Sequence, residues 1–353
     1  MRSLGSVGDR PLRETLIPIL RCPRCGQDGG WDLQVAHRDE REIREGSLTC
    51  ANCGAARTVQ DGIVDLMQAP PDFVTREAAG LERFADRMRA DGWDRERVLE
   101  LPYVQLGYWY AQATSMLDVL EGRVPGLDLS PGQRILDVGS NTCWASAMFA
   151  KRALEVVALD IAPHEMQGLR SADWWFEANN VYFERVLGVM FEPALASMSF
   201  DLVWCCEVLH HNHRSNLHRT LEELFRLLKP GGKLIIVNEP VRALRSPKLR
   251  PGQDVAEYEG HEHAYLRHSY LKAVRAAGFQ VDLFGPSRLG AFDPATLGIS
   301  TRMSAFDGFK VALTHTVRHH PRLRSGYLAW KTYVDGMSLH LIGTKPKNLA
   351  VDS

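Results

Sequence analysis

Residues 134–144 read Arg-Ile-Leu-Asp-Val-Gly-Ser-Asn-Thr-Cys-Trp, an apolar strand that turns at Gly139 and leads into an alanine-rich helix. A strand, a glycine-bearing turn and a helix bring the backbone close to a ligand at a helix amino terminus. Asp160 ends the next apolar strand, 21 residues beyond Gly139. A carboxylate at that distance is suited to accept both hydrogen bonds from a ribose diol. Together these features predict a site for an adenosine-type cofactor.

The alternation of strand and helix continues toward the carboxyl end. Residues 200–211 begin as another buried strand, and a helix with leucines on one face follows them. Leu-Lys-Pro-Gly-Gly at 228–232 is a helix stop and a glycine turn that leads into a further strand. Such alternation is typical of a doubly wound parallel sheet, so we predict an α/β fold.

Residues 100–345 resemble the class I S-adenosylmethionine-dependent methyltransferases. The landmarks occur in the family's order: Asp-Val-Gly at 137–139, Asp160, Phe-Asp-Leu-Val at 200–203, Val-Leu-His-His at 208–211 and Leu-Lys-Pro-Gly-Gly at 228–232. The resemblance implies a Rossmann-like, seven-stranded doubly wound sheet whose last strand, expected at 338–346, is reversed. It also implies that the turn at Gly139 surrounds the methionine part of the cofactor and that Asp160 holds the ribose.

Three positions depart from the family pattern. Asn141 and Cys143 stand where the family usually has two further glycines, and Val189 stands where an aspartate usually lies near the adenine amino group. Because asparagine tolerates a left-handed conformation and can donate a hydrogen bond to the methionine carboxylate, we expect the turn to be kept. Adenine is expected to rely on apolar contacts and backbone hydrogen bonds.

The predicted site residues gather at the carboxyl ends of the strands, where open α/β sheets bind their ligands. Methyl transfer from a sulfonium is an in-line displacement, so holding the reactants in line is the main requirement. If the acceptor is a hydroxyl, a histidine with its ordinary pKa of about 6.5 is a suitable base. The alternative is that such side chains cap a helix or satisfy local N–H groups. The predicted catalytic residues are His210, His211 and Glu239, and the predicted cofactor-binding residues are Asp137, Gly139, Asn141, Asp160, Ile161, Met190, Cys206 and Glu207.

For the acceptor pocket, the resemblance implies His263 and Tyr265, because family members often carry a histidine and an aromatic residue there. His-Glu-His at 261–263 also looks like a set of metal ligands, but it lacks the helical H-E-x-x-H spacing, so we favour pocket lining. Tyr108 belongs to an aromatic group at 103–110 that either caps a ligand or packs in the core, and we include it among the substrate residues.

Four cysteines form two close pairs near the amino terminus. Cys22 and Cys25, and then Cys50 and Cys53, make C-x2-C twice with 24 residues between, and each pair is followed by a glycine. Two such knuckles predict a four-thiolate zinc site, which is structural because no position is left for a substrate; redox dithiols are the alternative. Asp-Gly at 61–62 predicts a hairpin. The first 67 residues resemble the small zinc-ribbon activators that partner tRNA, rRNA and translation-factor methyltransferases.

Length and composition set the wider limits. The 353 residues carry a formal charge of −1, which removes the simplest argument for a general polyanion binder. We expect a zinc ribbon over 1–70, a helical linker or lid over 71–125 and the methyltransferase domain over 126–353, with an insertion at about 286–336. We see no membrane span and no export peptide, and therefore expect a cytoplasmic protein.

Three functions follow. The favoured function is methylation of a small or medium-sized metabolite, such as a natural product, sugar or lipid intermediate, with S-adenosylmethionine as methyl donor and a structural Zn²⁺. The second is methylation of rRNA or tRNA, because zinc ribbons precede this fold in some RNA-modifying enzymes. The third is a non-catalytic cofactor-binding partner, which the departures at Asn141, Cys143 and Val189 motivate. The acceptor atom and the oligomeric state stay open.

Overall fold

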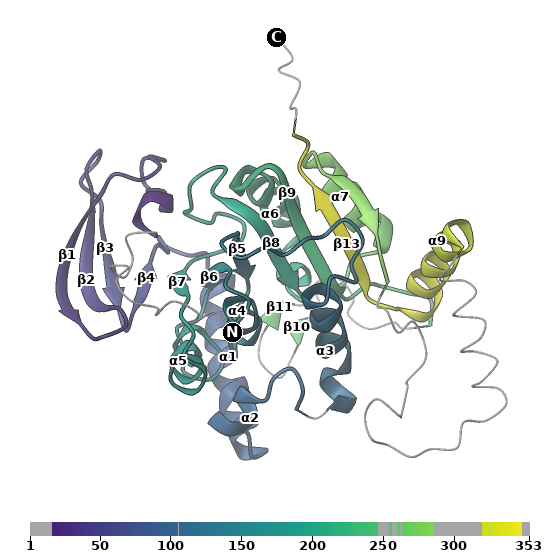
Figure 1. The fold of residues 1–353 in the computed structure, drawn as a ribbon, viewed down its shortest axis with the longest axis horizontal. Coiled ribbons are helices and arrows are strands. Elements are labelled where there is room, and N and C mark those ends of the chain that lie inside the picture. Colours follow the sequence, from purple (N-terminus) through teal and green to yellow (C-terminus); the bar gives the residue numbers. More distant parts are fainter. Residues whose placement is uncertain are drawn as a thin grey trace, which may run out of the picture.

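A computed structural model describes residues 16–104, 106–245, 254–255, 260–261, 263–285 and 320–347. Its main feature is an 11-stranded sheet with the order β1-β2-β3-β4-β7-β6-β5-β8-β9-β13-β12 (Figure 1). The strands are β1 (Trp31–Arg38), β2 (Ile43–Cys50), β3 (Ala56–Gln60), β4 (Ile63–Asp65), β5 (Arg134–Val138), β6 (Glu155–Asp160), β7 (Glu184–Leu187), β8 (Phe200–Cys206), β9 (Leu228–Glu239), β12 (Gln280–Leu283) and β13 (Leu339–Thr344). A small separate pair consists of β10 (Asp254–Val255) and β11 (Gly260–His261).

Seven of these strands form the predicted methyltransferase sheet. Strands β7, β6, β5, β8 and β9 are parallel to one another. β13 runs antiparallel to both β9 and β12, so the last strand is reversed as expected. The α/β fold class and the doubly wound order are therefore confirmed.

Helices cover both faces of the sheet. The α-helices are α1 (Asp72–Ala90), α2 (Arg95–Leu99), α3 (Leu106–Leu120), α4 (Trp144–Ala150), α5 (Ala172–Asn179), α6 (Arg214–Leu227), α7 (Arg267–Ala276) and α9 (Pro321–Trp330). Short turns of helix are η1 (Ile17–Ile19), η2 (Leu169–Ser171), η3 (Leu209–His211) and η5 (Lys331–Asp335). Alternate strand residues point to opposite faces. In β5, Leu136 belongs to the core under α6 and α7, whereas Ile135 belongs to the core under α3, α4 and α5.

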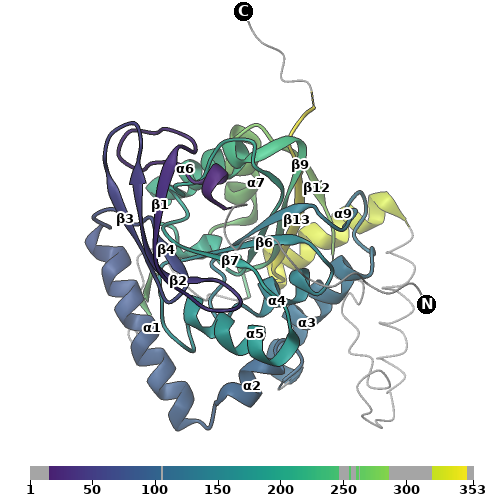
Figure 2. The same cartoon turned by 60° about the vertical axis from the view of Figure 1, so that its left-hand side comes forward.

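The four amino-terminal strands extend the methyltransferase sheet. We call residues 16–66 the ribbon. Its last strand, β4, pairs in parallel with β7, with Val64 opposite Val186 (Figures 1 and 2). A second backbone contact joins the ribbon to the loop before β8: the Arg21 N–H donates to the Ala194 carbonyl at 2.9 Å. The ribbon core and the core under α6 and α7 form one hydrophobic cluster, so the ribbon packs as part of this fold.

The predicted hairpin at 61–62 is confirmed. Asp61 and Gly62 both have positive φ angles, 50° and 77°, as a two-residue turn between β3 and β4 requires. The predicted insertion falls mainly outside the described residues, since 286–319 are not described and α9 with η5 covers part of the remainder. Within the described part of the chain, no helix has the length and apolar character needed to cross a bilayer.

Candidate functional site

A cavity opens at the carboxyl ends of β5, β6, β7 and β8. Its floor comes from the segments that follow these strands, and one wall comes from α1, which runs along this side of the molecule in Figure 2. Parallel α/β sheets bind ligands at this edge, so the location agrees with the sequence prediction. The lining residues are Phe73, Val74, Glu77, Leu81, Gly139, Leu159, Asp160, Ile161, Gly188, Val189, Met190, Phe191, Glu207, Val208, His211 and Asn212.

The turn after β5 keeps its shape despite the missing glycines. Gly139, Asn141 and Cys143 have φ angles of 67°, 44° and 56°, so the asparagine and the cysteine adopt the left-handed conformation that glycine favours. The expectation that Asn141 preserves the turn is thus confirmed. At Gly139 a Cβ atom would also collide with Val208, which comes from the segment after β8. The contact with Val208 is therefore what favours glycine at 139, since Asn141 and Cys143 show that other residues can adopt a positive φ in this turn.

Asp160 lies at the end of β6 beside this turn. Its Oδ2 accepts a hydrogen bond from the backbone N–H of Asn141 at 2.8 Å, and its Oδ1 accepts one from the N–H of Ala162 at 2.9 Å. Burial raises the pKa of the Asp160 carboxyl to about 6, although these backbone donors counteract part of the effect. Each carboxylate oxygen has a second lone pair, so Asp160 can still accept hydrogen bonds from a ligand.

The far end of the cavity is apolar. Val189 and Phe191 follow β7 and pack against Val74 of α1, with Phe73 and Ile161 at the edge of the same cluster. The Phe73 and Phe191 ring centroids are 5.9 Å apart. Apolar contacts therefore surround the position where the family usually carries an aspartate, as the sequence predicts for Val189. Met190 lines the same end, and its sulfur receives a hydrogen bond from the Asn212 side chain at 3.1 Å.

Three predicted cofactor residues are not among the described residues that line the cavity. Asp137 is buried and accepts a hydrogen bond from the Ser146 hydroxyl at 2.6 Å, and burial raises its pKa to about 7. Asn141 contributes its backbone N–H to Asp160. Cys206 is half-buried, and its sulfur contacts the Asn238 amide at 3.7 Å. These residues shape the wall, whereas Gly139, Asp160, Ile161, Met190 and Glu207 reach the cavity itself.

The three predicted catalytic residues separate into two groups. His211 lines the cavity, and its Nδ1 lies 2.6 Å from Oε1 of Glu77 in α1. His210 instead turns toward Glu239, with 3.2 Å between its Nδ1 and the glutamate Oε1. Glu239 is fully buried and also accepts hydrogen bonds from the Tyr270 hydroxyl and from the backbone N–H groups of Val208 and Leu209, where η3 begins. Burial by itself would raise the pKa of the Glu239 carboxyl. The contact with His210 and the other hydrogen bonds outweigh this effect, so the pKa is lowered. Neither His210 nor Glu239 is among the described residues that line the cavity.

The predicted substrate residues lie around η3. The backbone N–H of His263 donates to the His210 carbonyl at 2.7 Å, and the Tyr265 hydroxyl donates to the Asn212 carbonyl at 2.7 Å. Both side chains are buried, and neither is among the described lining residues. Tyr108 belongs to α3, but its side chain lies outside the described residues.

Sequence reasoning expected a helical linker or lid over 71–125 and named Tyr108 of α3, but it singled out neither the lining residues of α1 nor Gln112. Phe73, Val74, Glu77 and Leu81 recur at helical spacing and line the cavity from α1. Gln112 of α3 donates its Nε2 hydrogen to Oε2 of Glu207 at 2.6 Å. The helical spacing of these four α1 residues is the sequence signal that could have pointed to them, because neither helix carries a recognisable motif.

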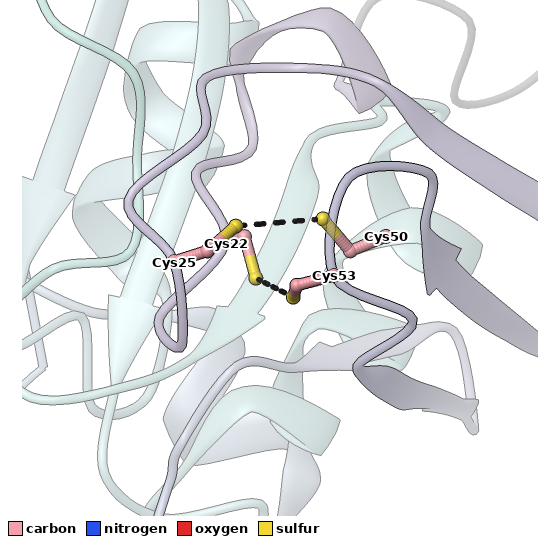
Figure 3. Close-up of side chains that lie close together, drawn as sticks. All are labelled: Cys22, Cys25, Cys50 and Cys53. Atoms are coloured by element: carbon pink, nitrogen blue, oxygen red, sulfur yellow. Dashed lines mark hydrogen bonds between the residues drawn. The ribbon is translucent and has the colours of Figure 1, made fainter.

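The four predicted metal ligands converge at one end of the ribbon (Figure 3). The sulfurs of Cys22 and Cys53 are 3.6 Å apart, those of Cys25 and Cys50 are 3.8 Å apart, and all four lie within 4.8 Å of one another. Zn–S bonds of about 2.3 Å in a tetrahedron place sulfurs about 3.8 Å apart, so the set fits zinc. Hydrogen bonds from the Asn52 side chain and the Gln27 backbone lower the pKa of Cys25 to about 6, which favours the thiolate.

Comparison with known proteins agrees with the geometry. Residues 136–236 match the family model described as a methyltransferase domain. Malonyl-[acyl-carrier protein] O-methyltransferase of Serratia marcescens is 29% identical over 172 residues, 48% of this chain and 63% of that protein. The 27-O-demethylrifamycin SV methyltransferase of Amycolatopsis mediterranei is 30% identical over 140 residues, 37% of this chain and 48% of that protein.

A solved complex of the Haloferax volcanii Trm112 methyltransferase activator with a putative methyltransferase is 18% identical, with a TM-score of 0.44; the match covers 79% of this chain and all of that one. For the two curated relatives, the matched region covers less than two thirds of the relative's own length. Its sheet order, its strand-end cavity and the family match agree on one identification: residues 136–236 form a class I methyltransferase domain of the S-adenosylmethionine-dependent type.

Proposed function

We propose that this protein is an S-adenosylmethionine-dependent methyltransferase that acts on a small or medium-sized metabolite. The observation that carries the proposal is Asp160, a buried carboxylate beside the Gly139 turn in a cavity at the strand ends. The ribose diol would bind Asp160, the methionine part would lie along the turn, and the adenine would occupy the apolar end formed by Val189 and Phe73. Ile161 and Met190 would complete the adenine end.

When bound, S-adenosylmethionine supplies an electrophilic methyl group. The chain's own contribution is then to hold the acceptor in line with it and to exclude water. Of the three candidate bases, His211 is the one that lines the cavity, and the carboxylate of Glu77 favours its protonated form once it has taken a proton. We assign His210 and Glu239 a positioning role, because their mutual contact fixes η3 beside the cavity.

The charge of the ribbon argues against a nucleic-acid acceptor. Residues 16–66 contain six arginines and eight acidic residues, so the ribbon has no excess of positive charge for phosphate contacts. The two curated relatives above are named for a malonyl-[acyl-carrier protein] and a rifamycin, which are not nucleic acids. We also propose that the four ribbon cysteines bind one structural Zn²⁺. The domain limits at residues 70 and 125 and the cytoplasmic location stay predictions.

The decisive experiment combines cofactor binding with methyl transfer. We expect S-adenosylhomocysteine to bind in calorimetry, and we expect the label of methyl-labelled S-adenosylmethionine to enter the small-molecule fraction of a cell extract. Asp160→Asn should weaken S-adenosylhomocysteine about tenfold to a hundredfold, because hydrogen bonds to a charged group are lost. The control is Asp282→Asn, which changes an exposed carboxyl of β12.

Each other outcome contradicts a stated part of the proposal. Label in RNA would replace the metabolite with an RNA acceptor. Binding without any transfer would indicate a non-catalytic partner. The absence of binding, or an Asp160→Asn variant that binds as wild type does, would remove the proposed cofactor site altogether.

The elevated pKa of Asp160 predicts a pH dependence of cofactor binding. Above a pKa of about 6 the side chain is a carboxylate that accepts from the diol, and below it the group is protonated. The affinity for S-adenosylhomocysteine should therefore fall about tenfold between pH 7 and pH 5. The fall should be absent in Asp160→Asn. Asp137, whose raised pKa depends in part on the charge of Asp160, is not among the described residues that line the cavity. A wild-type affinity that is flat over this range would contradict the assignment.

A further inference from the structure

Helix α9 leaves an apolar face open to solvent. Leu323, Tyr327 and Trp330 follow one another at intervals of four and three residues, so they lie on one face of the helix. Leu323 is 55% exposed and Trp330 is 56% exposed, whereas Leu328, on the opposite side, is buried. Figure 1 shows α9 at the margin of the molecule, beyond β13. A surface helix normally buries its wider apolar face, so this orientation points to a contact with a partner.

The segment after β9 and the start of α7 bring further apolar side chains to the end of α9. The Leu244 N–H donates to the Tyr333 carbonyl at 3.0 Å, and the Leu244 side chain is 85% exposed. The guanidinium of Arg267 lies over the Tyr333 ring, 5.6 Å from its centroid, which places the neighbouring Leu266 in the same region. Seven large apolar side chains are exposed in the described part of the chain, and this region holds four of them: Leu244, Leu266, Leu323 and Trp330. We call these four residues and Tyr327 the α9 patch.

The surroundings of the α9 patch are basic. Six arginines or lysines and one acidic residue occur in the three segments that carry it, 241–245, 266–268 and 321–335. The acidic residue, Asp335, already pairs with Arg245 and Lys331, at 3.3 and 2.9 Å. Because the whole chain has a formal charge of −1, this excess of positive charge is local. An anionic surface is the complementary partner.

The mixture of side chains favours a lipid surface over a protein partner. Tryptophan and tyrosine are enriched where bilayers meet water, leucine side chains enter the acyl boundary, and arginine and lysine bind anionic headgroups. The ten residues of α9 contain members of all three classes. Leu244 has few neighbours at 85% exposure and therefore protrudes, which suits insertion into a fluid surface better than packing in a groove.

We propose that the α9 patch binds the surface of an anionic lipid bilayer. Leu244, Leu323 and Trp330 enter the boundary between headgroups and acyl chains, while Arg245 and Lys331 lie at the level of the headgroups. None of the patch residues is among the described residues that line the cofactor cavity. The proposal therefore goes beyond the proposed function and does not rest on it.

Cosedimentation with lipid vesicles tests the proposal. The probes are vesicles of phosphatidylcholine alone and vesicles of phosphatidylcholine mixed with phosphatidylglycerol. We expect binding to the mixed vesicles to be at least about tenfold stronger than to phosphatidylcholine, and to weaken as salt screens the headgroup charge. Leu323→Glu should weaken binding to the mixed vesicles about tenfold or more, because it removes an inserting side chain and adds a negative charge.

Met198→Glu is the matched control. Met198 is 57% exposed and precedes the amino end of β8, whereas α9 precedes the amino end of the reversed strand β13, at the other edge of the sheet. The substitution makes the same change of charge on an equally exposed apolar side chain, so vesicle binding should change less than about twofold. Both variants alter exposed residues, and thermal melting should match that of the wild type.

Equal binding to both kinds of vesicle, or a Leu323→Glu variant that binds as the wild type does, would overturn the proposal. An equal loss for Met198→Glu would also overturn it, because net charge and not the patch would then govern binding. Sedimentation velocity without lipid tests a second copy of the chain as the occupant. Dimers that Leu323→Glu dissociates, or no binding to either kind of vesicle, would overturn the proposal in favour of a protein partner.

Discussion

Cys50→Ser will leave the protein without its zinc and will unfold the ribbon. Four thiolates in a tetrahedral arrangement make a closed site, and zinc binding to such a site contributes about 10 kcal/mol to the folding of a small domain. The ribbon also packs on the main hydrophobic core, but most of β1 is exposed and β4 has only three residues, so the zinc site should supply a large share of its stability. Serine cannot replace the fourth thiolate, so metal affinity and ribbon folding fail together.

The effect will extend to the methyltransferase domain. Without the ribbon, β7 would become an edge strand with unpaired N–H and C=O groups, since β4 is its partner on that side. Val64 of β4 and Leu20 also belong to the hydrophobic cluster that continues under α6 and α7. The wall helix α1 begins six residues after the ribbon, at Asp72, so cofactor binding should weaken as well.

Metal analysis, thermal melting and S-adenosylhomocysteine calorimetry measure this prediction. The wild type should contain about one zinc per chain, and Cys50→Ser should contain markedly less and melt at a lower temperature. Arg24→Ala is the control, because Arg24 lies exposed between Cys22 and Cys25 and its replacement leaves all four thiolates intact. A metal-free wild type that is fully folded would refute the zinc site, and unchanged melting of Cys50→Ser would refute the coupling to the rest of the protein.

Local signals explain what the sequence predicts well. Strand and helix periodicity and the glycine turn at 139 are short-range features, and they suffice for the alternation of strands and helices, whereas the seven-stranded sheet is what the family resemblance implies. The turn expected at 228–232 is instead the start of β9, which follows α6 directly. The cysteine spacing likewise anticipates the convergence of the four sulfurs, because each knuckle is a local turn closed by a glycine with positive φ, Gly26 or Gly54.

Long-range pairing explains what the sequence leaves out. β4 has three residues, and nothing in Ile63, Val64 or Asp65 indicates that they pair with a strand about 120 residues away. The sequence therefore predicts the ribbon but not its continuation of the methyltransferase sheet. In the same way, the motif at 207–211 identifies a strand end but not the direction of each side chain. It is tertiary packing that turns His210 toward Glu239 and leaves His211 at the cavity.

A buried group of charges fixes the ribbon against the methyltransferase domain. Arg185 of β7 is completely buried, and its guanidinium contacts Glu42 of the ribbon and Asp173 of α5, the latter at 2.9 Å. Burial by itself would lower the pKa of the Arg185 guanidinium. The two nearby carboxylates have the larger effect, so the pKa is raised. Arg44 completes the group and lies 2.6 Å from Glu42. A Cβ atom at Gly62 would collide with both Arg185 and Glu42, so the hairpin glycine also makes room for this contact.

Glu42→Leu and Arg185→Met should each lower the free energy of unfolding by about 3 to 5 kcal/mol, because each leaves one charge buried without its main partner. The double variant should lose much less than the sum, since the remaining Arg44–Asp173 pair is partly exposed and stays intact. Urea denaturation of the wild type, the two single variants and the double variant measures the coupling free energy between Glu42 and Arg185. The control is Arg170→Met, which removes an exposed ion pair with Asp61 at the same interface and should cost less than about 1 kcal/mol. Equal losses for Arg170→Met and Arg185→Met would mean that surface contacts dock the ribbon. A double variant as unstable as the summed single variants would mean that Glu42 and Arg185 act independently.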